Sequence, residues 1–137
     1  MRLRLLLFLT VAALLGSAVY GHSSPTPSPA AGPPMQFDQF ILVLLVRPAT
    51  SPEIPKPELD QLQAEHLATI RRLHAEGKLL KAGPTEDKSG RNVRGIFILK
   101  TDSVETARDW VGSDPLIKRG RLVAEYLKWY VEKGSLK

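Results

Sequence analysis

The stretch that decides the fold is Pro57–Pro84, PELDQLQAEHLATIRRLHAEGKLLKAGP. Its apolar residues recur at helical spacing, so at about 100° per residue they fall on one stripe. Pro57 suits the first turn of a helix and Gly77 its end, and the residues after Gly77 predict a short strand that ends at Pro84. His66 lies in the middle of the stripe, where a leucine would be expected. The stripe comprises Leu59, Leu62, His66, Ile70 and Leu73.

Size and composition restrict the possible classes of protein. A chain of 137 residues supports one domain with a hydrophobic core. It has no cysteine, which excludes disulfides, thiol catalysis and cysteine-bound metal. The formal charge is +5, but the basic residues are mixed with acidic ones and form no run. Aromatic residues do not interleave with them, so we do not expect nucleic-acid binding.

The N-terminal region predicts export. Residues 1–21 have the pattern of a signal peptide, in which Arg2 and Arg4 precede an apolar run that ends in small residues. That run is shorter than the ~20 residues a spanning helix needs, so a periplasmic or secreted protein is expected, with a retained membrane anchor as the alternative. Residues 22–36 are rich in proline and serine and predict a linker. His22 could chelate copper if cleavage exposed it, but a solvated linker residue is favoured because no third ligand is evident.

The first expected strand, residues 37–47, has apolar residues on both of its alternating faces. A strand in a two-layer domain buries only one face, so a second copy of the chain is the simplest cover for the other. A polar turn at residues 85–92 and an apolar run at residues 93–100 predict a hairpin with the strand before them.

The C-terminal half predicts a second helix and a fourth strand. Ser103 can cap the helix and Gly112 can end it, and a short helical turn at residues 116–120 leads to a strand at residues 121–131. The resulting β-α-β-β-α-β order predicts a ferredoxin-like α+β domain over residues 37–131, with a four-stranded antiparallel sheet and both helices on one face. Residues 132–137 are expected to be a tail.

Several motifs, taken in order, resemble the YCII (YciI-like) domain family. They are the stretch HLATIRRLHAEGKLLKAGP from His66 to Pro84, Gly95-Ile-Phe, Asp114-Pro115, Gly120 and Trp129-Tyr130. The resemblance covers the folded part from Phe37 to Val131 and implies a dimeric α+β barrel, in which two sheets pack face to face. It also implies a pocket between helix and sheet, with His66 and Asp114 as its active-site pair and lyase or isomerase chemistry.

The candidate site residues each have a structural alternative. His66 could be a neutral core histidine, and Asp114 could simply cap the turn at Pro115. Together, an imidazole oriented by a carboxylate is a competent general base. His74 follows on the same helix as a candidate substrate contact, with a structural role near the helix end as the alternative. Gly83 and Pro84 are candidate substrate contacts through their backbone, or serve only to shape the strand end.

The sequence indicates no cofactor. It also indicates no metal, because His66 and His74 are not at the i, i+4 spacing of a helical metal site. The favoured hypothesis is an exported homodimer in which His66 moves a proton on a small molecule and Asp114 orients the ring. The alternatives are a non-catalytic module that binds a small molecule and a dimer with a purely structural role.

Overall fold

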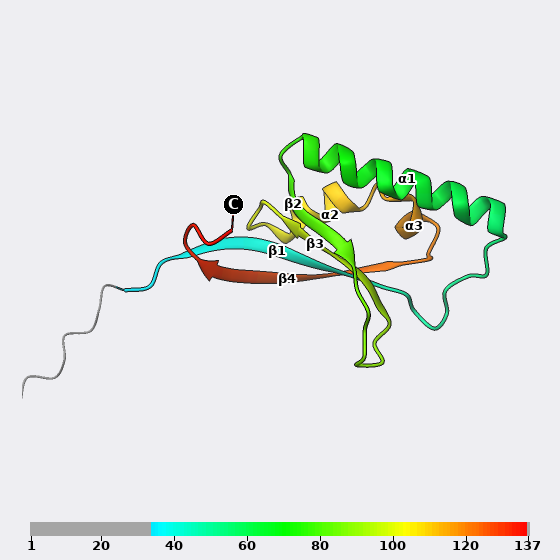
Figure 1. The fold of residues 1–137 in the computed structure, drawn as a ribbon, viewed down its shortest axis with the longest axis horizontal. Coiled ribbons are helices and arrows are strands. Elements are labelled where there is room, and N and C mark those ends of the chain that lie inside the picture. The colour runs from blue at the N-terminus through cyan, green and yellow to red at the C-terminus, as the bar shows by residue number, and fades with distance from the viewer. Residues whose placement is uncertain (1–33, 137) are drawn as a thin grey trace, which may run out of the picture. The chain divides into compact units, whose positions relative to one another are not determined.

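The computed structural model describes residues 34–136 of the chain. The expected signal segment, residues 1–21, and most of the linker, residues 22–36, therefore lie outside the described residues. This part contains four strands and three helices, which are labelled in Figure 1. They are β1 (Phe37–Val46), α1 (Lys56–Ala75), β2 (Leu79–Pro84), β3 (Val93–Leu99), α2 (Val104–Val111), α3 (Pro115–Lys118) and β4 (Val123–Glu132).

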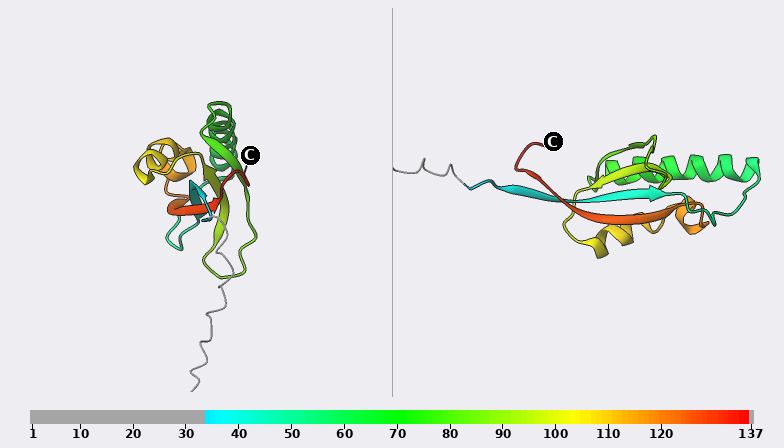
Figure 2. Two further views of the ribbon diagram at one scale, coloured as in Figure 1. Left: turned by 90° about the vertical axis from the view of Figure 1, so that its left-hand side faces the viewer. Right: turned by 90° about the horizontal axis from the view of Figure 1, so that it is seen from below.

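The four strands form one antiparallel sheet in the order β2-β3-β1-β4. The two central strands are β3 and β1, which are separated in the chain by α1 and β2. All three helices lie on one face of the sheet, as two perpendicular views agree (Figures 1 and 2). The predicted ferredoxin-like β-α-β-β-α-β fold is confirmed, with α3 as the short extra turn before the last strand.

The hydrophobic core fills the space between the helices and the sheet. Alternate residues of β1 and β3 face the helices and are nearly inaccessible, and Leu73 of α1 is fully buried against them. Gly77, with φ +69, ends α1, where the backbone N–H of Lys78 donates to the carbonyl of Leu73. The core residues of the sheet are Ile41, Val43, Leu45, Leu79, Phe97 and Leu99, and those of the other helices and their loops are Ala107, Val111, Leu116 and Leu122.

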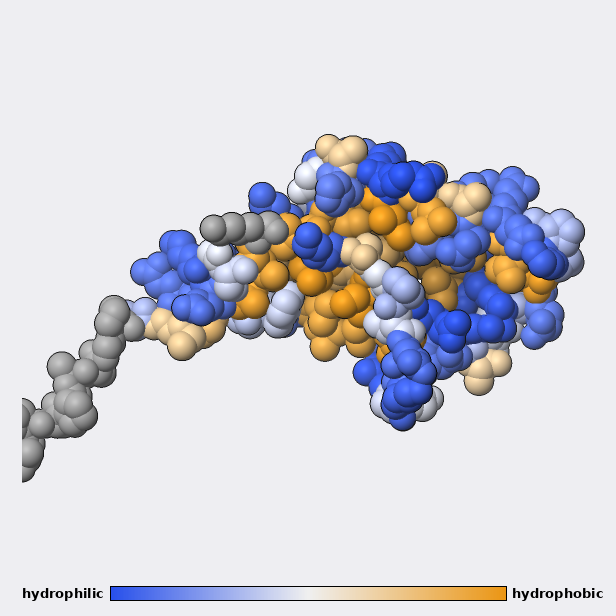
Figure 3. Space-filling model, in the orientation of Figure 1, coloured by the Kyte–Doolittle hydropathy of each residue, from blue (hydrophilic) through white to orange (hydrophobic). Residues whose placement is uncertain are grey.

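The opposite face of the sheet is apolar and has no helix over it. Pairing of Leu42 with both Ile98 and Leu127 brings apolar side chains of β3, β1 and β4 onto this open face. Leu127 and Val123 remain 45% and 48% exposed. Figure 3 shows apolar surface along this lower side of the sheet, in addition to the band between α1 and the sheet. We define the open face by Phe40, Leu42, Leu44, Val46, Ile96, Ile98, Val123 and Leu127.

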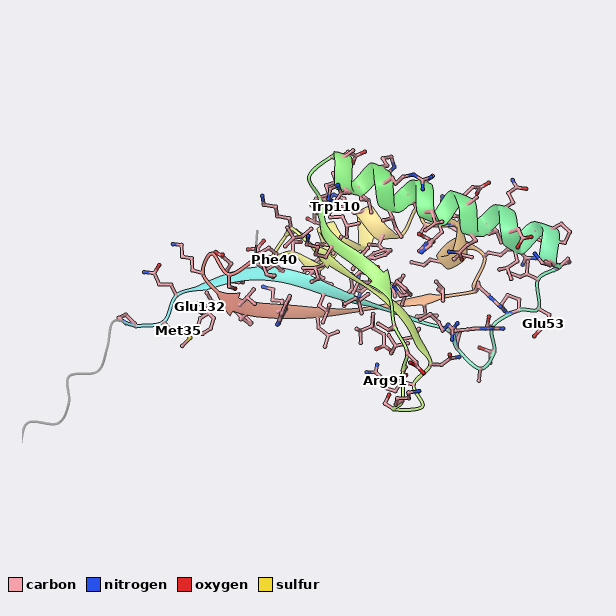
Figure 4. All side chains as sticks on the ribbon, viewed as in Figure 1. Met35, Phe40, Glu53, Arg91, Trp110 and Glu132 are labelled. Carbon is pink, nitrogen blue, oxygen red and sulfur yellow. The ribbon has the colours of Figure 1, made fainter. Side chains whose placement is uncertain are left out.

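The loop between β2 and β3 is held by side-chain contacts. The carboxylate of Asp87 accepts the backbone N–H groups of Ser89 at 2.7 Å and Val93 at 3.0 Å. Hydrogen bonds from Ser89 and Val93 lower the pKa of Asp87 to about 2. Arg91, which Figure 4 places at the tip of the hairpin below the sheet, forms an ion pair with Glu125 of β4.

Observed boundaries differ from the expected ones by one to a few residues. The fourth strand begins at Val123 rather than Arg121, because the N–H groups of Arg121 and Leu122 both donate to the carbonyl of Leu116 and not to β1. The helical turn expected at residues 116–120 is observed as α3, which begins one residue earlier, at Pro115. Arg119 is the C-cap of α3. No helix within residues 34–136 is long and apolar enough to cross a membrane.

Candidate active site

Helix α1 carries His66 into the core. Leu59, Leu62 and Ile70 pack against the same cluster that buries Leu73, so the apolar stripe fixes which side of α1 faces the sheet. His66 lies within that stripe and is only 8% exposed. Its ring is stacked on Phe97 of β3, with the centroids 6.0 Å apart and the planes inclined by 21°. The helix and the sheet thus fix the imidazole from two sides.

Asp114 reaches His66 from the turn between α2 and α3. It is fully buried and caps α3, since its Oδ1 accepts the backbone N–H of Leu116 at 3.0 Å. Its Oδ2 lies 2.6 Å from Nδ1 of His66. Both alternatives for Asp114 therefore hold at once, because one oxygen caps the helix and the other contacts the imidazole.

The two contacts of Asp114 decide how the imidazole is presented. A carboxylate can only accept hydrogen bonds, so Nδ1 of His66 carries the proton and donates it to Oδ2. Nε2 then holds a lone pair, and no side chain or backbone group among the described residues bonds to it. Every fully buried side-chain nitrogen or oxygen in this part of the chain has a partner, so Nε2 is not completely buried. The free nitrogen can accept a proton.

A cavity of about 510 Å³ lies between α1 and the sheet, and His66 is one of its lining residues. His66 and Phe97 form part of its wall, together with leucine and isoleucine side chains of α1. Its size falls in the ~300–1,000 Å³ range of small-molecule sites. The remaining lining residues are Leu45, Arg47, Leu59, Asp60, Gln63, Leu67, Ile70, Gly83, Pro84, Arg94, Gly95, Leu116, Arg121 and Leu122.

The other residues suggested by the sequence divide into two groups. Gly83 and Pro84, at the end of β2, line the cavity. His74 does not line it, since it lies two turns further along α1, is exposed, and falls in the last turn before Gly77. His74 therefore does not join the proposed site, because the helix turns its side chain away from the sheet at that position.

Three arginines at the cavity were missed by the sequence analysis. Arg47 follows β1, Arg94 lies in β3 and Arg121 precedes β4, so their convergence depends on strand pairing between distant parts of the chain. Nothing in their spacing indicates a cluster. For metals, no group of three His, Asp or Glu side chains close enough to hold an ion occurs in the described part of the chain.

The fold and the cavity define a ferredoxin-like domain with a buried His–Asp pair at a pocket between helix and sheet. A family model, the YCII-related domain, matches residues 40–129. The chain therefore belongs to the YCII family, as the sequence motifs predicted.

Similar proteins carry little description of activity. The chain is 31% identical to YjpA of Bacillus subtilis, an uncharacterized protein, over 70 residues, which are 51% of this chain and 78% of that one. It is 34% identical to the protein YciI of Escherichia coli over 61 residues, which are 40% of this chain and 62% of that one. An uncharacterized protein of Haemophilus influenzae is 31% identical over 65 residues, 43% of this chain and 66% of that one. The match thus spans less than two thirds of the last two relatives.

Two solved structures show a more distant likeness. One is 5-chloro-2-hydroxyhydroquinone dehydrochlorinase of Burkholderia phenoliruptrix in complex with 2,5-dihydroxybenzoquinone, at 22% identity and TM-score 0.45, covering 67% of this chain and 93% of that one. The other is a dimeric protein of unknown function with a ferredoxin-like fold from Bacteroides fragilis, at 12% identity and TM-score 0.38, covering 71% of this chain and 99% of that one. Both TM-scores lie below 0.5, so neither likeness bears on the activity of this chain.

Proposed function

We propose that this YCII-family protein transfers a proton on a small molecule bound in the cavity, with His66 as the base and Asp114 as the group that orients it. The observation that carries the proposal is the 2.6 Å contact between Oδ2 of Asp114 and Nδ1 of His66, which leaves Nε2 as the accessible nitrogen. Elimination or isomerisation fits this equipment, because both begin with removal of a proton from carbon.

The chemistry follows from the two ring nitrogens. Nε2 takes a proton from a carbon next to a carbonyl group, and the electron pair of the broken C–H bond moves into an enolate. The ring becomes an imidazolium, whose positive charge is balanced by the carboxylate of Asp114. The enolate then either expels a leaving group from the neighbouring carbon or, when it is conjugated with a further double bond, is protonated by the imidazolium at the far carbon of that system. The first outcome is an elimination and the second an isomerisation.

The surroundings of the pair favour this role over a purely structural one. A histidine that only filled space would be sealed, whereas His66 lines a cavity and has one nitrogen without a partner among the described residues. Phe97 and the leucines of α1 make part of the wall apolar, which strengthens charge interactions at that part of the cavity. The competing hypothesis is a module that binds the same molecule without reaction.

Deuterium uptake from D₂O tests the proposal without knowledge of the natural substrate. The full chain is incubated with a panel of cyclic ketones and 1,3-diones, and exchange at carbon is followed by NMR. We expect one or more compounds to exchange faster with the wild-type chain than with His66→Gln, whose amide is too weak a base. Exchange that is equal for wild type and His66→Gln across the panel, together with His66-independent ligand binding, would favour the non-catalytic module.

We further propose that the chain forms a homodimer through the open face of the sheet. Its central strands present apolar side chains on that face, and Leu127 and Val123 stay about half exposed in the single chain. A second copy would cover them with an identical apolar surface, which gives a closed two-fold assembly. The family resemblance to dimeric α+β barrels supports the same arrangement.

Export of the chain is also proposed, on the sequence of residues 1–21 alone. The intact mass of the protein recovered from cells tests it. Loss of about 21 residues with recovery outside the cytoplasm is expected, and a full-length mass in the cytoplasmic fraction would contradict it.

A further inference from the structure

We infer that the cavity binds a small organic anion, in which a carboxylate is attached to a compact apolar group. Arg47, Arg94 and Arg121 select this ligand by its charge. The inference deepens the proposed function, on which it rests, by naming the substrate class of the same cavity. It is carried by the three arginines that line the cavity and by the absence of an acidic partner for them among residues 34–136.

The charge balance of the cavity is positive. No carboxylate within residues 34–136 forms an ion pair with any of the three arginines. The one acidic side chain of the lining, Asp60, is paired with Lys56 at 2.5 Å. Asp114 is engaged with His66 and with the backbone of Leu116. A neutral ligand would leave the guanidinium charges unbalanced, whereas a carboxylate would neutralise part of them.

Arg121 is held in place before any ligand arrives. Its Nη1 donates to the carbonyl of Pro52 at 3.2 Å and to Oγ of Ser51 at 3.4 Å, both in the loop between β1 and α1. These partners are neutral, so they fix the half-buried guanidinium without cancelling its charge. Its Nε and Nη2 donate to no acceptor among the described residues. A guanidinium presents its donors in a planar fork that matches a carboxylate.

Arg94 owes its place at the cavity to a β-bulge. The pairing of β1 with β3 steps from Leu45 and Gly95 to Val46 and Val93, so Arg94 is an extra residue without a partner on β1. Strict alternation would place Arg94 on the face opposite to Gly95. The extra residue breaks that alternation, and Arg94 joins Gly95 in the lining. Bulges commonly redirect a side chain next to a functional site in this way.

The rest of the wall fits the apolar part of such a ligand. Leu59 and Ile70 of α1 and Phe97 of β3 line the same cavity as the arginines. A carboxylate held by guanidinium groups would leave a ring or a short branched chain against these side chains. His66 lines the same cavity, so an acid bound there would lie next to the proposed base.

Paired probes test the inference in the full chain. Benzoate and cyclohexanecarboxylate are titrated by NMR at constant ionic strength against their neutral counterparts benzamide and cyclohexanecarboxamide. The acids should bind at least about tenfold more tightly, the difference typical of a charge-assisted hydrogen bond. Arg94→Gln and Arg121→Gln should each remove most of this preference. Arg71→Gln, which deletes the same charge on the exposed side of α1, is the control and should leave the preference intact.

Each outcome decides the inference. Equal binding of acids and amides, or equal weakening by Arg71→Gln and Arg94→Gln, would overturn it, because the effect would then be absent or a matter of overall charge. Phenyl phosphate serves as a further probe, and a preference for it over benzoate would overturn the choice of carboxylate. Arginine-dependent binding of acids without any His66-dependent deuterium exchange would support this inference and contradict the proposed catalysis. His66-dependent exchange of neutral ketones, without arginine-dependent binding of acids, would support the proposed catalysis and contradict this inference.

Discussion

Gly95 of β3 and Gly83 of β2 approach so closely that a Cβ atom on Gly95 would lie 3.0 Å from the carbonyl oxygen of Gly83. Both residues line the cavity, and the close approach sets the position of the edge strand β2 at its rim. The glycine in the central strand therefore serves to bring two backbones together.

Gly95→Ala should destabilise the domain, because the carbonyl of Gly83 must move to admit the methyl group. We expect a loss of about 1–2 kcal/mol in the free energy of unfolding, measured by denaturant titration. Gly83→Ala is the matched control, since a Cβ there meets no atom within 4 Å. A loss of the same size in both variants would show that the contact between the two glycines is unimportant.

Asp114→Ala should be more harmful to stability than Asp114→Asn. The alanine variant loses both the cap of α3 and the contact with His66, at a cost of about 2–4 kcal/mol, whereas asparagine can retain the cap. Thermal and denaturant unfolding measure the difference. Ser103→Ala at the start of α2 removes only a cap and should cost about 1 kcal/mol. If Asp114→Ala and Ser103→Ala lose the same free energy of unfolding, the bond between Asp114 and His66 contributes no stability.

The loop around Asp87 should keep its structure to unusually low pH. The pKa of Asp87 is lowered from its ordinary value of 3.8 to about 2 by hydrogen bonds from Ser89 and Val93. A depressed pKa means that the contribution to stability is complete above the unfolded value and is lost as the pH falls through the folded one. The amide signals of Ser89 and Val93 should therefore move with a midpoint near pH 2, and Asp87→Asn should abolish that step. A midpoint at the ordinary carboxyl value of 3.8 would contradict the assignment.

Leu127→Glu should dissociate the proposed dimer. Leu127 is 45% exposed on the open face, where a carboxylate would be buried against its counterpart in a second copy. Sedimentation or light scattering should give twice the chain mass for the wild type and the single mass for the variant. Leu67→Glu is the control, since Leu67 is 44% exposed but lies on α1, on the helical side of the sheet. If the wild-type chain is monomeric at high concentration, the proposed dimer is wrong.

The fold could be predicted from the sequence because its signals are local. The helical stripe around His66, the stop at Gly77 and the turn between β2 and β3 each follow from neighbouring residues, and their order leaves few sheet topologies. The predicted start of the fourth strand at Arg121 was wrong by two residues, since Arg121 and Leu122 bond back to Leu116 rather than to β1. Local signals do not reveal such long-range competition for backbone groups.

The candidate site could be predicted only in part. His66 and Asp114 were marked because one is polar within an apolar stripe and the other precedes a proline, and the structure places them in contact. Arg94 carried no such signal, because it reaches the cavity through a bulge that depends on the pairing of Val93 with Val46. A bulge of this kind arises from the whole sheet and has no mark in a single strand.

The tautomer of His66 is the measurement that tests the central claim most directly. Long-range ¹⁵N NMR of the full chain distinguishes a protonated from a bare ring nitrogen. We expect a proton on Nδ1, a bare Nε2, a shift of the Nε2 signal on addition of benzoate, and reversal of the tautomer in Asp114→Asn. A proton on Nε2 in the wild type, or an Nε2 signal unmoved by any ligand that binds the cavity, would contradict the role of His66 as a base.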